Sequence, residues 1–409
     1  MPSPVIQQQD RAQILDILRG IAVLGICIAN YPMFSLYIFQ SPDVLLTMPT
    51  ATLDKGVAFF HFAFIDGKFY SLFALLFGIG FSIILMRCQQ AGKNGLYIFY
   101  RRIFILILFG LAHLLLLWEG DILMLYGLIG LLLPLFRSVS DRNLLIIVVC
   151  LILSPILIDL IKVLTDNKIN AGRLLQGAAI AADDARGITP QNFGTWVLDH
   201  PAYSDLLSFN QSGILWRFQM LLDNNRIPKV LGMFLLGLYA GRKMMYAKLD
   251  ENAALLKKVC RWGYLIGLPL SIAHAWLELN GKKLPHAAGM LNTITYALSV
   301  VPLSLAYVAS ICLFFIKNPG NKFLNLFAAP GRMALSNYIL QTILGIIIFY
   351  GIGFGLGAKT GAIYVILIAL AVYFFEMIWS HLWLKYFRYG PLEWIWRMFT
   401  YGKYLPIKK

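Results

Sequence analysis

Residues 101–134 place one histidine and two acids between apolar runs, in the order RRIFILILFGLAHLLLLWEGDILMLYGLIGLLLP. His113 lies five residues before Trp118, inside the first run, and an ionisable ring at that depth is costly unless it faces a cavity or a partner. Histidine is the most frequent general base, and Asp121 could orient its ring. Asp121 could equally cap the free N–H groups of the returning helix. The stretch therefore predicts either a catalytic pair or a polar helix end.

A second polar set lies on the first apolar stretch, RAQILDILRGIAVLGICIANYPMF. Asn30 follows Arg19 by eleven residues, and eleven steps of about 100° return almost to the same angle, so both should project from one helix face, about 16 Å apart. The planar guanidinium of Arg19 suits a phosphate arriving from the cytosol. Alternatively, Asp16 and Arg19 form a helix-end anchor and Asn30 makes an interhelical hydrogen bond. The residues alone favour these structural roles.

The segment GRMALSNYILQT adds Arg332, Asn337 and Gln341, with the two amides on one helix face. These three side chains could line a cofactor channel or join neighbouring helices. His274 and Glu278 could form a base and its orienter but are expected to satisfy one another. Glu376, with Ser380 one turn on and His381 nearby, could be functional or could pair with a neighbouring helix.

Composition indicates what must position these residues. The 409-residue chain is 59% hydrophobic and 13% charged, which predicts an all-α, polytopic membrane helical bundle. At about 1.5 Å per residue, each long apolar run can cross most of a hydrocarbon layer about 30 Å thick. We expect about ten crossings, at 14–34, 68–87, 102–118, 121–136, 142–163, 228–246, 261–279, 288–316, 331–353 and 361–386.

The expected crossings divide the chain into four parts. Residues 1–164 hold the first five crossings and 228–386 the second five. Between them, 165–227 is expected to be an extracytoplasmic loop or small cap, which could select a substrate or merely link the halves. Residues 387–409 are expected to form an amphipathic helix at the cytoplasmic interface, where anionic lipid heads can bind.

The distribution of basic residues predicts the orientation. The net charge of +15 comes without the aromatic spacing of a nucleic-acid-binding motif, so no nucleic acid is expected. Basic residues gather in the loops of one side, and the loops opposite hold few, mainly Lys55, Lys282, Lys283 and Lys359. By the positive-inside rule both termini are cytoplasmic and the His113 hairpin tip faces outward. Residues 1–13 lack the pattern of a removable signal peptide.

Neither metals nor disulfides are expected. The five cysteines all fall in expected crossings or at their cytoplasmic ends, and no His/Cys group has the spacing of a zinc site. The sequence also lacks a P-loop and a GxGxxG motif in a strand–helix context.

Five segments, taken in order, resemble the YeiB-like family of bacterial membrane proteins: LDILRGIAVLGICIAN, GKFYSLFALLFGIGF, FGLAHLLLLWEGDILMLYGLIG, GRMALSNYILQT and YFRYGPLEWIWRMFTYG. The resemblance covers most of the chain except the outward segment, and its GDIL and GPLEW pieces are the specific ones. That family is loosely associated with transport, and its fold resembles that of transmembrane acyltransferases such as the lysosomal heparan-sulfate acetyltransferase. The resemblance therefore implies an acyltransferase-like fold in a bacterial cytoplasmic (inner) membrane.

The resemblance also suggests roles for single residues. The LRGIA segment resembles the first core helix of the heparan enzyme, which supports Asn30 as an active-site residue. Sugar-acylating relatives have a histidine at that position, eleven residues after the motif arginine, and the heparan enzyme's own histidine has no match between Tyr31 and Thr52. If this chain is an acyltransferase, its base must come from elsewhere, and His113 is the best candidate.

The resulting hypothesis is an acyl transfer in which Arg19 binds the phosphates of cytosolic acyl-CoA or acetyl-CoA. His113 would be the base, Asp121 its orienter, and Asn30 the donor to the oxyanion. The expected partners are membrane lipids and a sugar or other small-molecule acceptor, and a homodimer is allowed. The alternative is a transporter or flippase in which the same polar face forms a solute path and no covalent step occurs.

Overall fold

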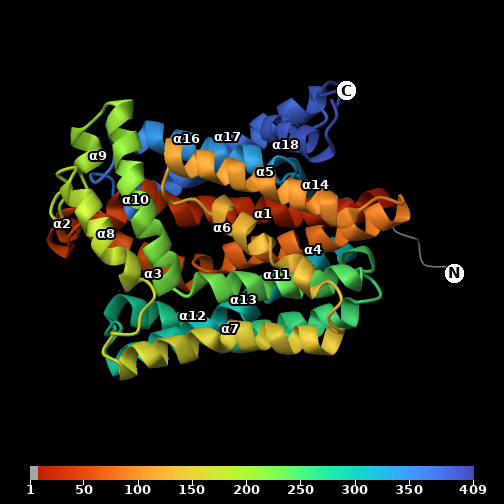
Figure 1. Ribbon diagram of the computed structural model, residues 1–409, viewed down its shortest axis with the longest axis horizontal. Coiled ribbons are helices and arrows are strands. Elements are labelled where there is room, and N and C mark those ends of the chain that lie inside the picture. Colours follow the sequence, from red (N-terminus) through yellow and green to blue (C-terminus); the bar gives the residue numbers. More distant parts are fainter. Residues whose placement is uncertain (1–7) are drawn as a thin grey trace.

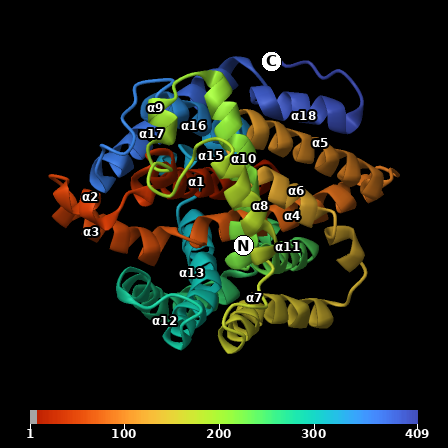
Figure 2. The ribbon, with the colours of Figure 1, turned by 60° about the vertical axis from the view of Figure 1, so that its left-hand side comes forward.

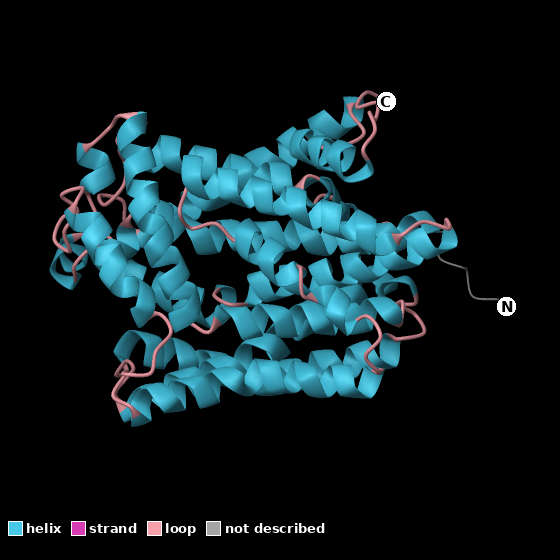
Figure 3. Ribbon diagram, viewed as in Figure 1, coloured by secondary structure: helices cyan, strands magenta, loops and turns pink. Residues whose placement is uncertain are grey.

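The computed structural model describes residues 8–409, with side chains from residue 13, and shows an all-helical bundle (Figure 3). The sole β pairing within that range is an isolated bridge between Phe387 and Lys408. The expectation about a signal peptide concerns residues that lie mostly outside it. The α-helices are α1 (Gln8–Phe34), α2 (Pro42–Thr47), α3 (Ala51–Phe60), α4 (Lys68–Gln90), α5 (Gly95–Leu116), α6 (Leu123–Gly130), α7 (Asp141–Leu164), α8 (Arg173–Asp184), α9 (Trp196–Asp199), α10 (Tyr203–Asp223), α11 (Arg226–Arg242), α12 (Ala253–Asn280), α13 (Met290–Lys317), α14 (Lys322–Asn325), α15 (Ala328–Arg332), α16 (Ala334–Phe349), α17 (Ala362–Tyr386) and α18 (Pro391–Tyr401).

The predicted polytopic helical membrane bundle is confirmed. Among the described residues, six helical segments are long and apolar enough to span a membrane: Gln13–Phe34, Ala51–Gln90, Gly95–Leu116, Asp141–Leu164, Ala287–Lys317 and Ala362–Tyr386. A seventh is the pair Lys322–Arg332 and Ala334–Phe349, if it is counted as one span bent by 80°.

Three of the ten expected crossings do not meet these criteria of length and composition. Residues 121–136 form α6, of only 8 residues, followed by a 3-10 turn that contains Pro134. Residues 228–246 form most of α11, which has 17 residues. Residues 261–279 lie in α12, which has 28 residues but includes charged and polar side chains.

The long helices run side by side, and α8, α9 and α10 lie together at one end of the bundle, which we call the cap end (Figure 1). Helix α10 crosses this end in front of α5 and α6 (Figure 2). These helices make up most of the expected cap at 165–227, so that segment is ordered helix packed on the bundle. The described part of α1 begins at the opposite end, where α18 also lies (Figure 1).

Close contacts between helix backbones, at positions occupied by glycine, hold the centre of the bundle together. A Cβ atom on Gly78 of α4 would lie 2.0 Å from the Phe234 carbonyl oxygen of α11, and one on Gly237 would lie 2.1 Å from the Leu75 carbonyl oxygen. Because only glycine allows so close an approach, α4 and α11 pack almost backbone to backbone, as small-residue interfaces do in membranes.

A similar contact closes the hairpin of α5 and α6. A Cβ atom on Gly110 would lie 2.3 Å from the backbone nitrogen of Met124. Since Gly110 precedes His113 by about one helical turn, this glycine sets the distance between the histidine and the start of α6.

The predicted orientation can be tested with Thr189→Cys, Lys248→Cys and Lys403→Cys, because all three positions are exposed. A membrane-impermeant maleimide added to intact cells should label Thr189→Cys, in the cap, and neither of the other two. The wild-type chain measures background labelling of the native cysteines. Labelling of Lys248→Cys without labelling of Thr189→Cys would reverse the orientation.

Candidate functional site

His113 is joined to a carboxylate on one side and to a hydroxyl on the other. Its Nδ1 atom lies 2.8 Å from Oδ1 of Asp121, and its Nε2 atom lies 2.9 Å from Oγ1 of Thr342 on α16. The side chains of His113 and Asp121 are fully buried, and Thr342 is 1% exposed. The structure therefore brings together two of the three predicted catalytic residues and adds a hydroxyl that the sequence analysis missed.

The donor roles follow from the partners. An ionised carboxylate can only accept, so Nδ1 of His113 carries the proton and donates it to Asp121. In a neutral imidazole Nε2 is then the acceptor, and it faces the Thr342 hydroxyl, whose other acceptor within reach is the Tyr338 carbonyl oxygen at 3.4 Å. The arrangement gives His113 the orientation of a general base whose free nitrogen faces a hydroxyl.

Asp121 also caps the helix that follows it, so the two roles proposed from the sequence coexist. Its Oδ2 atom accepts from the backbone nitrogen of Met124 at 2.6 Å. Its backbone carbonyl accepts from Nε and Nη2 of Arg217 at 3.0 and 2.7 Å. Because Arg217 belongs to α10, the cap is tied directly to the residue that orients His113.

Tyr338, one turn before Thr342, completes the wall beside the histidine. Its ring centroid lies 5.1 Å from that of His113. Its hydroxyl is buried near the backbone of Ile122 and has no hydrogen bond of normal geometry within the described chain. A buried hydroxyl without a partner is costly, which makes Tyr338 a second functional candidate that the sequence analysis did not single out.

In the α16 segment the sequence analysis considered the two amides and did not single out Tyr338 or Thr342. A hydroxyl one turn after the tyrosine in SNYILQT is a weak signal on its own. Arg217 was missed because it lies in the segment expected to be a cap or a linker.

Helix α16 is held at its start by Glu393 of α18. The carboxylate of Glu393 accepts from the backbone nitrogens of Leu335 and Ser336 at 2.7 and 3.0 Å. These contacts cap the helix and satisfy donors that would otherwise be unpaired, so the GPLEW segment fixes the helix that carries Thr342.

The turn between α5 and α6 lies outside the spans and carries Glu119. One carboxyl oxygen of Glu119 is buried without a hydrogen-bond partner among the described side chains and backbone. Burial raises the pKa of Glu119 from its usual 4.5 to about 7, although the cation of Arg217 acts in the opposite direction. Burial also lowers the pKa of Arg217 to about 10. The hairpin tip thus holds a carboxyl group that titrates near neutrality.

The other predicted site residues lie apart from this cluster. Asn30 is half-buried and makes no side-chain hydrogen bond with any described residue, so its oxyanion role stays a prediction. Arg19 donates to Asp16 at 2.6 Å and lies 3.5 Å from the Gly331 carbonyl oxygen, near the end opposite the cap. Arg332 is exposed and donates to the Arg388 carbonyl oxygen.

Asn337 and Gln341 face α17 rather than solvent. Asn337 donates to Ser380 at 2.9 Å, and Gln341 donates to Glu376 at 2.8 Å. The exposed fractions of Asn337, Gln341 and Glu376 are 0%, 2% and 0%. The two amides therefore join helices, and a binding role for them stays a prediction.

His274 and Glu278, expected to satisfy one another, are joined through a third residue. Nδ1 of His274 lies 2.6 Å from the Asn292 side-chain oxygen, and the Asn292 amide donates to Glu278. The set is therefore a bridged structural network at the start of α13.

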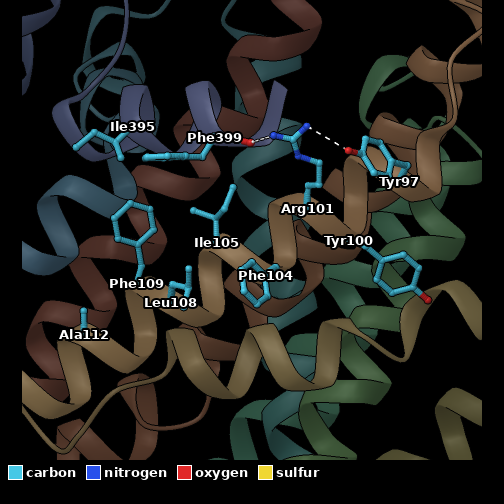
Figure 4. A pocket seen from close by; sticks show the side chains of 10 residues that line it. All are labelled: Tyr97, Tyr100, Arg101, Phe104, Ile105, Leu108, Phe109, Ala112, Ile395 and Phe399. Carbon is cyan, nitrogen blue, oxygen red and sulfur yellow. Dashed lines mark hydrogen bonds between the residues drawn. The ribbon is translucent and has the colours of Figure 1, made fainter. Parts of the chain in front are cut away.

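A groove of about 720 Å³ lies between α5 and α18, with Arg101 donating to the Phe399 carbonyl oxygen and to Tyr97 (Figure 4). Ala112 lines it, but Ala112 is exposed whereas His113 is buried on another face of α5. The groove is therefore separate from the cluster around His113.

Comparisons with known proteins place the chain in a family. A model described as "Protein of unknown function (DUF418)" matches residues 240–403. The chain is 30% identical over 410 residues to the uncharacterized protein YxaH of Bacillus subtilis (strain 168), covering 98% of this chain and 96% of that protein. The chain belongs to the YeiB-like family. The uncharacterized protein YeiB of Escherichia coli (strain K12) is 27% identical over 406 residues, or 96% of each chain. The predicted membership of the YeiB-like family is thereby confirmed.

The buried carboxyl of Glu119 predicts a pH-dependent stability. Its folded-state pKa is raised, so the folded protein keeps a proton that the unfolded chain loses as pH rises from about 4.5 to about 7. Glu119 should therefore lower the stability of this YeiB-like protein at pH 8 and have no effect on its stability at pH 4. Glu119→Gln should raise the apparent unfolding temperature in detergent by a few degrees at pH 8 and leave it unchanged at pH 4.

Glu251→Gln is the control, because Glu251 is exposed and pairs with Lys248 on the surface. An equal gain for Glu119→Gln at both pH values would show that burial does not perturb this carboxyl.

Proposed function

We propose that this YeiB-like protein is a membrane acyltransferase that moves an acyl group from acyl-CoA to a sugar or lipid-headgroup acceptor, with His113 as the general base. The proposal rests on the buried line from Asp121 through His113 to Thr342, with contacts of 2.8 and 2.9 Å. A carboxylate that fixes the imidazole and a free ring nitrogen that faces a hydroxyl are what proton removal from an alcohol requires.

In the proposed reaction an acceptor hydroxyl or amine replaces the Thr342 hydroxyl beside Nε2 of His113. Nε2 takes the acceptor proton while the acceptor oxygen or nitrogen bonds to the acyl carbon. The carbon–sulfur bond of the thioester breaks, and the imidazolium returns the proton to the leaving thiolate. Asp121 stabilises the imidazolium, and each such contribution is worth about 2–4 kcal/mol in other enzymes.

Asn30 is the proposed donor to the oxyanion on the evidence of the family resemblance. The unpartnered hydroxyl of Tyr338 is a second candidate for that role, since its ring lies beside His113. His113 and Thr342 are buried, so the acceptor must enter by a local movement. Helix α10 is the proposed moving part, and its movement would break the bonds that Arg217 and Tyr203 make to the hairpin backbone, Tyr203 at 2.8 Å from the Leu116 carbonyl oxygen.

Acyl-CoA or acetyl-CoA would supply the acyl group. Arg19 and Arg332 fit its phosphates, because both are at least partly exposed and Arg19 reaches the backbone next to Arg332. Asn337 and Gln341 fit less well, since both are buried and bonded to α17. Their proposed part is to keep α16 and α17 together.

The proposal also implies where the protein lies and what it contacts. The protein would lie in the bacterial inner membrane with both termini cytoplasmic, so that the donor binds inside and the acceptor arrives at the cap end. Membrane lipids would surround it, and a homodimer remains compatible with the mechanism.

The mechanism is tested in liposomes with purified protein, a panel of acyl-CoAs from acetyl to palmitoyl, and total membrane lipid as acceptor. Release of free thiol should fall about 10²–10⁴-fold in His113→Ala and in Asp121→Asn, because both remove the oriented base. Arg19→Ala should instead raise the acyl-CoA concentration needed for half-maximal rate, with a smaller effect on the maximal rate.

His381→Ala is the matched control, because His381 is exposed on α17 and its side chain hydrogen-bonds, within the described residues, to the Met377 carbonyl oxygen alone. Unchanged thiol release per folded molecule in His113→Ala, together with a lower unfolding temperature, would make the histidine structural and defeat the proposal.

Transport of a small solute or lipid is the second candidate, and the α16–α17 interface favours it. Three buried oxygens there have no hydrogen-bond partner in the described structure: Oδ1 of Asn337, Oε1 of Gln341 and Oε1 of Glu376. Intramembrane polar groups of this kind often line a solute or proton path. Transport predicts solute movement without thiol release, and the same liposomes can report both.

A further inference from the structure

Two helices begin side by side at the cap end with cations in their first turns. Helix α4 begins at Lys68, and α11 begins at Arg226 and has Lys229 one turn on. Gly78 of α4 packs on Phe234 of α11, and Ser82 of α4 packs on Gly241 of α11. The contacts advance in the same direction along both chains, so the helices run parallel. Their positive dipole ends therefore point the same way.

Neither start is neutralised in the usual manner. The first turns of α4 and α11 contain no acid, and neither helix has a side-chain cap. Asn225, which stands at the cap position of α11, donates instead to Asp159 at 2.7 Å. A cation at a helix N-terminus is unfavourable, and here two helices carry three of them.

The two cations of α11 have no anionic hydrogen-bond partner within the described chain. Lys229 is 9% exposed, and its ammonium lies 4.3 Å from the ring centroid of Tyr296. The half-buried guanidinium of Arg226 lies 4.7 Å from the ring centroid of Tyr70. Tyrosine faces hold a cation but leave its N–H donors free, so both groups can still donate to a ligand.

The neighbouring charges leave an excess of cations. Lys68 is fully buried and donates to the Phe62 carbonyl oxygen at 2.7 Å. Asp66, two residues before α4, is the acid that acts on Lys68, Arg226 and Lys229. Asp159 also acts on Lys229 but is already bonded to Lys162 at 2.8 Å. Nε2 of His61 is buried and, among described atoms, unpartnered. The cluster therefore has more positive charge and more free donors than the protein satisfies.

We infer that the paired starts of α4 and α11 form an anion-binding site, between the half-buried Arg226 and the buried Lys229, that takes a phosphate or carboxylate group. Arg226 would hold the anion through its planar fork, and Lys229 would bind it from the inner side. The backbone N–H groups of Arg226 and Ile227 would complete the site, since Pro228 in the same turn has none. A cavity of about 10 Å³ beside Lys229 and Tyr296 has room for one water, so the anion would settle by displacing water and moving these side chains.

This site is independent of the proposed acyl transfer, because its residues do not include His113 or its partners. It could serve a substrate of either candidate function. The anionic group could belong to a free solute or to a lipid headgroup, and the chemistry of recognition is the same for both.

The test uses full-length protein in phosphatidylcholine nanodiscs, titrated with inorganic phosphate at constant ionic strength against chloride. Wild type should bind phosphate saturably by calorimetry and unfold at a higher temperature in its presence. Arg226→Gln and Lys229→Gln should each weaken binding at least about tenfold, and Arg226→Lys should weaken it less because it keeps the charge but loses the fork. Lys168→Gln, an exposed cation of the cap segment, should bind as wild type does.

A second arm identifies the source of the anion. In nanodiscs of phosphatidylglycerol, a headgroup ligand would block phosphate binding, and native mass spectrometry would find that lipid retained by wild type and lost from Arg226→Gln. A free solute would leave phosphate binding equal in both lipids. Lys229→Gln should also raise the unfolding temperature without phosphate, since it removes a buried unpaired cation. The inference is overturned if wild type neither binds phosphate nor retains phosphatidylglycerol, or if Lys168→Gln weakens binding as much as Arg226→Gln.

Discussion

Asp121 is the residue on which the candidate site depends. Its carboxylate accepts from His113 and from the backbone nitrogen of Met124, and its carbonyl accepts from Arg217. A buried carboxylate costs several kcal/mol unless it is paired and hydrogen-bonded, so these contacts must form together. The requirement joins three elements at one point: the end of α5, the start of α6 and the middle of α10.

The same constraint explains the shape of the hairpin. Helix α6 begins just after Asp121, whose carboxylate accepts from the Met124 backbone nitrogen, and Gly110 allows it to approach α5 closely. It ends after eight residues, before the 3-10 turn that contains Pro134. Helix α16 then meets the hairpin with Thr342 directed at His113, and Glu393 of α18 caps its start. The site is thus assembled from segments at both ends of the sequence, which only close packing of the bundle brings together.

Polar groups gather at the cap end in both halves of the bundle. The cluster around His113 has its charges paired, whereas the starts of α4 and α11 carry cations that the protein leaves partly unpaired. A hydrogen bond from the Tyr126 hydroxyl to the Tyr70 carbonyl oxygen, 2.7 Å long, links the two regions. A paired cluster suits a fixed geometry for chemistry, and an unpaired one suits a ligand that brings the missing charge.

The sequence alone determined the fold class, the family and the hairpin with its polar tip, because these depend on local apolar periodicity and on motifs read along the chain. It also brought His113 and Asp121 together, since they are eight residues apart on one hairpin. It did not yield Thr342, Tyr338 or Arg217, because their partners are some 96 to 229 residues distant and the helices must pack before the pairs exist. Only the tertiary structure decided that α6 ends before a 3-10 turn with Pro134 and that the segment 165–227 is mostly helix packed on the bundle. It likewise decided which buried charges remain unpaired, since pairing depends on which helix faces meet.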